Sequence, residues 1–171
     1  SACWGCERRE RGGQADHAGG RRVDVRCPGR AGSGSHHRAR DVRAGGTGDI
    51  TGKNELWTNN LGADVPTPTT DGKYIYVLRD NGTVNCLEAL TGKIIYEKQR
   101  IESGTYSSSP LLADGKLYCI NEEGTATVVK AGPAFEILSV NKLESHTLAS
   151  PVAVDNQIFI RTGNYLYCIE E

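Results

Sequence analysis

A pattern that repeats about every 40 residues fills the sequence from Val65 to Glu171 and constrains the fold more than any other feature. Aspartate-led turns recur at Asp71-Gly72, Asp114-Gly115 and Asp155-Asn156, in steps of 43 and 41 residues. A Thr-Gly or Ala-Gly pair begins at residues 51, 91 and 131, and a proline after a small residue stands at 68, 110 and 151. Self-similarity at such a period indicates a repeat architecture and takes precedence over single-residue motifs.

Each repeat contains short apolar runs bounded by Gly, Asp and Asn, which is the pattern of strands and hairpins. The first full copy predicts strands at 65–70, 73–79, 83–88 and 93–98, with a two-residue type I′ turn at Asn81-Gly82. The second copy predicts strands at 108–113, 116–121, 125–130 and 135–140. The last copy begins at Leu148, continues through 157–162 and 165–170, and lacks a fourth strand.

The second strand of each repeat is apolar on both sides, at residues 74–78, 117–120 and 158–160. A sheet with one face in water would alternate polar and apolar residues, so both faces of these strands should be covered. Four-stranded sheets stacked face to face around an axis are the blades of a β-propeller, whereas an open sandwich gives no reason for the period. The sequence predicts an all-β fold, a partial β-propeller of about two and a half four-stranded antiparallel blades.

The segment Cys86–Tyr96 resembles the repeat of the quinoprotein-like, or PQQ-binding-like, β-propellers. In that superfamily a Leu-Asp-Ala-type step ends the third strand, a Thr-Gly turn follows, and a tryptophan occupies the outer strand. Glu88 stands here for the aspartate and Tyr96 for the tryptophan. The preceding copy keeps Trp57, and Phe135 is the replacement expected in the third copy. The resemblance implies that these rings cover a loop of the neighbouring blade and bury a large area.

The resemblance covers residues 44–171 and is closest to the C-terminal end of such a propeller. A propeller needs about four blades to close, so the chain is expected to be a fragment whose first partners are the remaining blades of the parent ring. The strand that completes the last blade is expected from elsewhere in that parent. The open ends should then expose apolar sheet faces.

Residues 1–43 differ from the rest in composition, with ten arginines, no lysine and no Leu, Ile, Phe or Tyr. Such a segment buries too little apolar surface to fold, so a disordered arm is expected. One interpretation is an arginine- and glycine-rich tail that binds nucleic acid. The other, which the missing lysines and the abrupt start of the repeats favour, is out-of-frame translation that ends near Asp41. On this interpretation no nucleic-acid partner is expected.

Several residues could carry chemistry, and each also has a structural explanation. A zinc site could be assembled on paper from Cys3, Cys6, Cys27, His17 and the pair His36-His37, but these residues lie in the arm. The run at 45–48 lacks the GK[ST] of a phosphate loop and is interpreted as a linker. The three repeated aspartates are expected to make turns. His146 has no sequence partner for a relay, and hydroxyls at 105–109 could line the axial channel or begin a strand.

Cys86, Cys119 and Cys168 are expected to be buried thiols that pack as small hydrophobes. Cys86 and Cys168 occupy equivalent strands two repeats apart, beyond the reach of a disulfide. The adjacent cysteine pair typical of quinoprotein alcohol dehydrogenases does not occur in the chain, which counts against that activity. No segment reads as a signal peptide or a membrane span.

The function expected from the resemblance is a non-catalytic scaffold, periplasmic or secreted in the parent organism, that binds a protein or an extended ligand on a propeller face. The alternative is part of a PQQ-dependent alcohol or sugar dehydrogenase, with quinone and Ca²⁺ on the ring axis. Fold alone does not choose between them. We assign no catalytic, cofactor-binding or metal-ligating residue in this chain and expect PQQ and Ca²⁺ only under the alternative.

Overall fold

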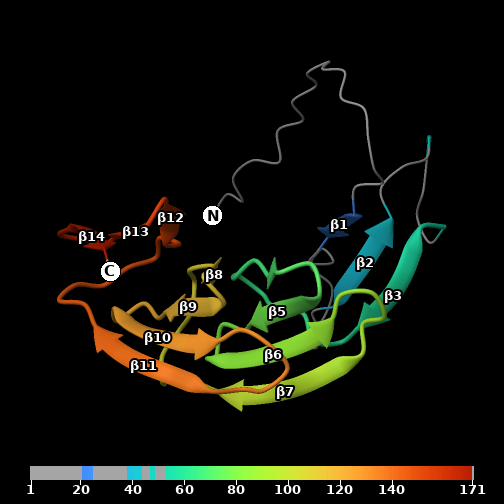
Figure 1. Cartoon of the computed structure of the whole chain (residues 1–171), viewed down its shortest axis with the longest axis horizontal. Helices are drawn as coiled ribbons and strands as arrows, with labels where there is room; N and C mark the ends of the chain where they lie inside the picture. Colours follow the sequence, from blue (N-terminus) through green and yellow to red (C-terminus); the bar gives the residue numbers. More distant parts are fainter. Residues whose placement is uncertain (1–20, 25–37, 44–46, 49–52, 171) are drawn as a thin grey trace, which may run out of the picture.

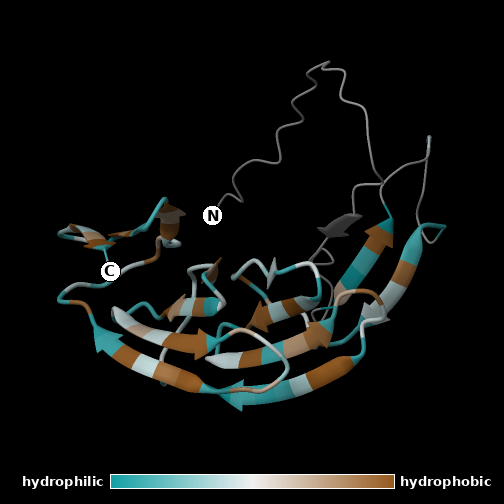
Figure 2. Ribbon diagram, in the orientation of Figure 1, coloured by the Kyte–Doolittle hydropathy of each residue, from teal (hydrophilic) through white to brown (hydrophobic). Residues whose placement is uncertain are grey.

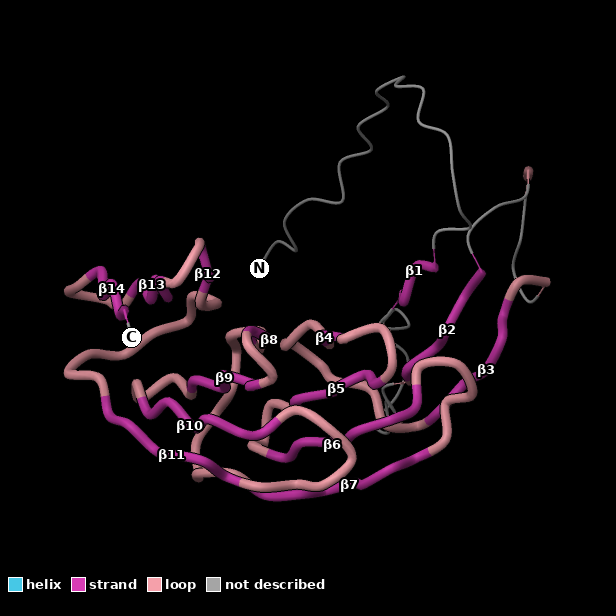
Figure 3. Tube along the Cα trace, in the orientation of Figure 1, coloured by secondary structure: helices cyan, strands magenta, loops and turns pink. Residues whose placement is uncertain are grey.

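The structure is a computed structural model that describes residues 21–24, 38–43, 47–48 and 53–170. Within these residues the chain forms strands and loops without helices (Figure 3). No described helix is long and apolar enough to cross a membrane. The expected zinc ligands and most of the expected disordered arm lie outside the described residues.

Four antiparallel sheets follow one another along the chain (Figure 1). The first contains β1 (Arg21–Asp24), β2 (Ala39–Arg43) and β3 (Glu55–Asn59). The second contains β4 (Thr69–Thr70), β5 (Tyr74–Leu78), β6 (Thr83–Glu88) and β7 (Ile94–Arg100). The third contains β8 (Leu111–Ala113), β9 (Lys116–Ile120), β10 (Thr125–Lys130) and β11 (Ile137–Lys142). The last contains β12 (Val152–Val154), β13 (Gln157–Arg161) and β14 (Leu166–Glu170).

Strand order within the second and third sheets follows chain order, so each sheet is a four-stranded meander. The outer strands β3, β7 and β11 lie along the convex side of the arc, and β8 lies toward its concave side (Figure 1). This is the arrangement of propeller blades, and the expected all-β partial propeller is confirmed. The last sheet has three described strands, as the sequence predicts.

Apolar clusters fill the spaces between successive sheets, and the hydropathy colouring shows brown segments along most inner strands (Figure 2). The largest cluster joins the second and third sheets and includes Tyr76, Tyr106 and Leu117, each 0–1% exposed. A second cluster joins the first and second sheets around Ile75, and a third joins the third and last sheets around Ile160. The central strands β5 and β9 are therefore covered on both faces, as their apolar pattern predicts, whereas β13 of the last sheet is at most half-buried apart from Ile160.

The first sheet begins earlier in the chain than expected. β2 lies within residues 1–43, pairs with β3 from Ala39 to Val42, and buries Ala39 and Asp41, each 1% exposed. The boundary expected between residues 43 and 44 therefore falls after a packed strand at 39–43. Composition hid this strand because it is short and only two of its side chains point inward.

The hairpin at Asn81-Gly82 differs from the expected type I′ turn. Only Gly82 has a positive φ, of 74°, whereas a type I′ turn needs positive φ at both central residues. The Gly82 amide donates to the Arg79 carbonyl at 3.0 Å, and the Arg79 amide donates to the Thr83 carbonyl at 2.8 Å. This is a longer turn that ends in one left-handed glycine, and the third sheet repeats it from Asn121 to Gly124.

The residues before the repeated prolines link one sheet to the next. The Thr67 amide donates to the Ser109 hydroxyl at 2.9 Å, and the Ser109 amide donates to the Ser150 hydroxyl at the same distance. These contacts join the starts of the innermost strands β4, β8 and β12. The small residues before proline are thus part of the contact between neighbouring sheets.

Candidate functional site

The repeated aspartates make turns, as the sequence predicts. Asp71 Oδ1 accepts the backbone N–H groups of Lys73 and Tyr74 at 2.8 and 2.7 Å, and its Oδ2 accepts the Tyr76 hydroxyl at 3.0 Å. Burial alone would raise the pKa of Asp71, but these hydrogen bonds outweigh it and lower the pKa below its ordinary value of 3.8. Asp114 and Asp155 adopt positive φ values of 46° and 52° at the equivalent turns.

The described residues do not fit a calcium-held quinone. Among residues 38–43 and 53–170 no group of three or more His, Cys, Asp or Glu side chains is placed to hold a metal ion. The turn carboxylate of Asp71 is already occupied by three donors, and Asp114 forms an ion pair with Lys116 at 3.0 Å. We derive no chemistry through quinone or Ca²⁺ from this part of the chain.

Trp57 covers the turn of the following sheet, as the resemblance implies. Its indole Nε1 donates to the Ala89 carbonyl at 3.1 Å, and a Cβ added to Gly92 would lie 2.4 Å from the indole ring. The neighbouring Asn59 amide donates to the Gly92 carbonyl at 3.3 Å. Glycine is required in this turn both by its φ of 69° and by the approach of the ring.

Tyr96 packs against the third sheet, where its ring meets Phe135 edge-on at 5.7 Å between centroids. Phe135 therefore belongs to the cluster between the second and third sheets, and its expected role as the next aromatic cover is wrong. It precedes β11, whose six residues are all exposed, so its side chain points back toward the preceding sheet. The sequence spacing alone could not show on which side of the strand this ring lies.

The hydroxyl-rich segment before β8 is used for structure. Ser107 donates to Glu122 at 2.5 Å, Ser108 donates to the Ile120 carbonyl at 2.7 Å, and Ser109 accepts the Thr67 amide. Tyr106 is 0% exposed and donates to the Glu102 carbonyl at 2.7 Å. This supports the interpretation of a strand start over that of a channel lining.

The cysteines of the repeat region are free thiols in two environments. Cys86 and Cys119 are buried, and burial raises the pKa of each to about 12. Cys168 is exposed, so its expected burial is wrong. It lies on β14, whose residues are exposed or half-buried, because no further described sheet packs on that side.

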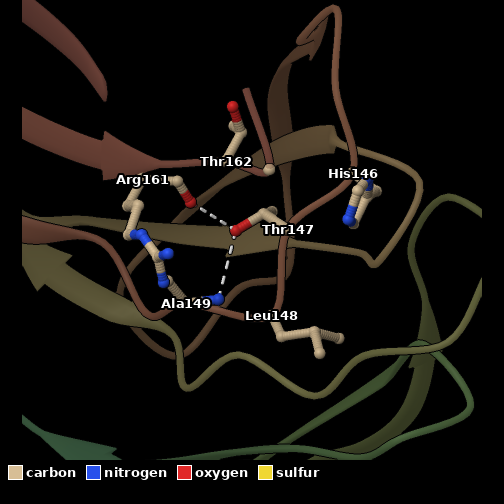
Figure 4. Close-up of a pocket in the computed structure, with 7 residues that line it drawn as sticks. His146, Thr147, Leu148, Ala149, Arg161 and Thr162 are labelled. Atoms are coloured by element: carbon tan, nitrogen blue, oxygen red, sulfur yellow. Dashed lines mark hydrogen bonds between the residues drawn. The ribbon is translucent and has the colours of Figure 1, made fainter. Parts of the chain in front are cut away.

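A pocket of about 170 Å³ lies where the third sheet meets the last (Figure 4). It is lined by the segment 146–149 and by residues 161–163 from the end of β13. The Thr147 hydroxyl donates to the Arg161 carbonyl at 2.6 Å and accepts the Ala149 amide at 3.1 Å, so it is fully occupied. The His146 side chain lies against Gly163 and has no described carboxylate partner. The pocket is smaller than common ligand sites of about 300–1,000 Å³ and holds no arrangement for a relay.

Thr147, which lines this pocket, takes the place of Tyr106 one repeat later. The Tyr106 amide donates to the Asp80 carbonyl at 2.9 Å, and the Thr147 amide donates to the Glu122 carbonyl at 3.0 Å. The backbone positions correspond, yet the tyrosine ring fills its interface and the threonine does not.

A larger pocket of about 520 Å³ lies in the crease between the first and second sheets. Its walls come from the end of β3, with Asn59 and Asn60, and from β7, with Glu97 and Lys98. Arg79, at the end of β5, also lines it. Sequence reasoning missed this site, because its residues come from three separate strands and match no local motif.

Comparison with known proteins supports the propeller assignment. No curated protein sequence matches the chain. Among solved structures, BamB from Moraxella catarrhalis superposes with a TM-score of 0.61 at 11% identity, over 77% of this chain and 36% of that one. The computationally designed Ika4 protein superposes with a TM-score of 0.54 at 13% identity, over 78% of this chain and 84% of that one. A europium-containing methanol dehydrogenase reaches 0.48 at 12% identity, over 71% and 22% of the two chains.

The chain thus spans about a third of the length of the Moraxella protein. Identities this low show the fold alone. The sequence profile of one family, described as outer membrane protein assembly factor BamB, matches residues 42–134. This match covers more than half of the 171 residues and includes Trp57, the Thr91-Gly92 turn and the first two of the three aspartate-led turns. The chain therefore belongs to the PQQ-repeat β-propeller family described as outer membrane protein assembly factor BamB.

Proposed function

We propose that this chain is the binding region of a non-catalytic propeller scaffold, periplasmic or secreted, and that β11 holds a protein partner in extended conformation. The observation that carries the proposal is the exposure of the whole strand. All six residues of β11 are exposed, and Ile137, Leu138 and Val140 are 41–46% exposed.

β11 is also an outer strand, because it pairs with β10 on one side and has no described partner on the other. A strand edge of this kind offers backbone N–H and C=O groups to an added strand, and alternate side chains provide the apolar contacts. Three of its six residues, Ile137, Leu138 and Val140, are apolar and exposed, so they offer apolar contacts along the strand. An export location is supported by the family description, which names an outer-membrane role.

The exposed face of the last sheet has a different proposed occupant. Val152, Val154 and Leu166 share this face through their pairing with Phe159, Gln157 and Arg161, and they are 52–69% exposed. Val84 and Ala126, which are equivalent to Leu166 in the second and third sheets, are only 1% and 8% exposed. We assign this face to the remaining blades of a longer propeller, an assignment that agrees with the 36% coverage of the Moraxella protein.

A photo-crosslinking amino acid at Leu138, introduced into the protein in its source cells, tests the partner surface. We expect a defined protein to be crosslinked at Leu138 and not at Lys53, an exposed residue just before β3 in the first sheet. Leu138→Glu should reduce capture by a crosslinker at Val140 without lowering the melting temperature. Equal capture at Leu138 and Lys53, or capture that Leu138→Glu leaves unchanged, would contradict the proposal.

An activity assay separates the scaffold from the dehydrogenase alternative. The full-length parent protein, supplied with PQQ and Ca²⁺, is expected to show no dye-linked oxidation of alcohols or sugars. Substrate-dependent reduction of the dye would replace the scaffold proposal with an enzymatic one.

A further inference from the structure

In the crease between the first and second sheets, Arg79 occupies a repeat position at which the other two sheets have a side chain that hydrogen-bonds within its own hairpin. Arg79 and Asn121 are equivalent, because each closes its hairpin through the same pair of backbone hydrogen bonds. The Asn121 side chain accepts the Thr125 amide at 2.7 Å and donates to the Ser103 carbonyl at 2.9 Å, which joins it to the preceding loop. Thr162 occupies the same place in the last sheet and accepts the Tyr165 amide at 3.0 Å.

Arg79 makes none of these side-chain contacts. Its guanidinium has no hydrogen bond or ion pair with any described residue, and its Nε is shielded from solvent without a partner. A buried cationic N–H group without a partner is costly, so natural structures rarely retain one unless a ligand or solvent completes it. Arg79 is one of the residues that line the pocket of about 520 Å³, a volume within the range of small-ligand sites.

A second departure brings another cation to the same pocket. β7 carries one extra residue opposite Asn85, where β6 advances by two residues and β7 by three. In the third sheet Thr127 faces Val140 directly, with no extra residue. This bulge places Lys98 at a φ of 55°, a conformation that disfavours side chains other than glycine.

The strained conformation of Lys98 is held from inside the sheet. Asn85 is 0% exposed, and its Oδ1 accepts the Lys98 amide at 2.7 Å. A buried amide side chain is thus used to keep a lysine in a bulge where glycine would fit without strain. Backbone strain that its surroundings maintain in this way is typical of binding and catalytic sites.

We propose that this crease binds a single carboxylate group, with Arg79 and Lys98 as its cationic partners. Arg79 offers the planar fork that pairs with carboxylates, and Lys98 adds a mobile point charge. Glu97 also lines the pocket, so the lining carries one net positive charge. This balance favours a singly charged carboxylate over a phosphate, which carries up to two negative charges at neutral pH. The exposed amide of Asn60 is available for a hydroxyl or peptide group beside the carboxylate.

A carboxylate of this kind can belong to a free hydroxy acid or to an acidic side chain of a bound peptide. Titration of the full chain with lactate, followed by backbone amide NMR signals, tests the first source. A capped Gly/Ser hexapeptide with one central glutamate tests the second. We expect saturable shifts at Asn60, Arg79 and Lys98 with at least one probe, at concentrations on the order of millimolar for so small a ligand. Saturation by lactate assigns a free acid, and saturation by the peptide alone assigns a side chain.

Two variants and a charge-matched control complete the test. Arg79→Gln should weaken binding by about tenfold or more, as expected for loss of a charge-assisted bond. Lys142→Gln removes one positive charge on β11 and should leave binding unchanged. Lys98→Gly should weaken binding while it maintains or raises the melting temperature, because glycine adopts φ 55° without strain.

The proposal is overturned if neither probe shifts the three amides saturably. It is also overturned if Arg79→Gln and Lys142→Gln have equal effects, since binding would then reflect general basicity. Crosslinking at Leu138 is measured separately, so failure of the carboxylate site leaves the partner surface on β11 unaffected.

Discussion

The second and third sheets meet across a filled interface, whereas the third and last sheets meet across a partly open one. Both interfaces use equivalent backbone hydrogen bonds. In the first, the buried Tyr106 fills the space and Ser108 donates to the Ile120 carbonyl. In the second, the smaller Thr147 stands in place of the tyrosine and itself donates to the Arg161 carbonyl, which is equivalent to that of Ile120. The hydroxyl that bonds this carbonyl therefore comes from a position two residues earlier in the second interface than in the first.

This difference shows that the backbone contacts and the apolar filling of an interface can vary separately. The hydrogen bonds fix how neighbouring sheets are placed, and the side chains determine how much each interface contributes to stability. We therefore expect the filled interface to be the stable part of the chain and the last sheet to open first.

Thiol labelling gives the largest expected contrast. Cys86 and Cys119 lie in the second and third sheets with pKa values raised to about 12, whereas Cys168 is exposed on the last sheet. Because the thiolate is the reactive form, alkylation at pH 8 should be at least about a hundredfold slower at the two buried thiols. Mass spectrometry of peptides after timed labelling measures each rate. Comparable rates at Cys119 and Cys168 would show that the filled interface opens as readily as the last sheet.

Tyr106→Thr makes the filled interface resemble the open one. Loss of the buried ring should reduce the free energy of unfolding by about 3–5 kcal/mol, the range for large aromatic truncations. Tyr106→Phe removes only the hydrogen bond to Glu102 and should cost about 1 kcal/mol. Urea unfolding of both variants measures the difference. If Tyr106→Thr lost no more unfolding free energy than Tyr106→Phe, the ring of Tyr106 would not be the main contact of the interface between the second and third sheets.

Gly92→Ala tests the interface between the first and second sheets. The new Cβ would meet the Trp57 ring at 2.4 Å and also stand at φ 69°. Gly72→Ala is the matched control, because its φ is 87° and nothing lies within 4 Å of the added Cβ. We expect the control to lose about 1–2 kcal/mol of unfolding free energy through backbone strain. Gly92→Ala should lose about 1–3 kcal/mol more through overpacking. Equal losses would mean that the indole moves away without cost.

The smallest effect concerns the Asp71 turn, which lies in the second sheet beside the filled interface. Its pKa is lower in the folded chain than the ordinary 3.8, so its hydrogen bonds stabilise the fold above that pH. This stabilisation is lost as the pH falls from 3.8 through the lowered folded value. The melting temperature of wild type should exceed that of Asp71→Asn at pH 6, and the gap should narrow below pH 4. A difference in melting temperature that stays constant from pH 6 to below pH 4 would contradict stabilisation by the ionised Asp71 carboxylate.

The sequence predicted the strands well where turn residues close in sequence mark both ends. β6 and β10 coincide with the predicted 83–88 and 125–130, because each lies between a glycine turn and a second turn. The turn at Asn81-Gly82 was placed correctly but given the wrong type, since the dipeptide does not show how many flanking residues join the loop. Phe135 was misplaced for a related reason, because the face on which a ring lies depends on where β11 begins.

The candidate sites were beyond sequence reasoning. The pocket beside His146 is formed by a loop at 146–149 and by the end of β13, which only the folded structure brings together. The crease depends on Arg79 and Lys98, which are 19 positions apart and meet through a bulge that buried Asn85 maintains. Neither site has a local sequence pattern that would predict it.

The bonds from Thr67 to Ser109 and from Ser109 to Ser150 have a consequence for copy number. In both bonds a backbone amide of one unit donates to a serine hydroxyl of the next, so the two described contacts are head-to-tail and of the same kind. Contacts of this type form a closed ring when the rotation per unit divides a full circle, and an open helix when it does not. The number of units is then set by that rotation, and whole units can be gained or lost by gene duplication or deletion while each junction keeps its chemistry.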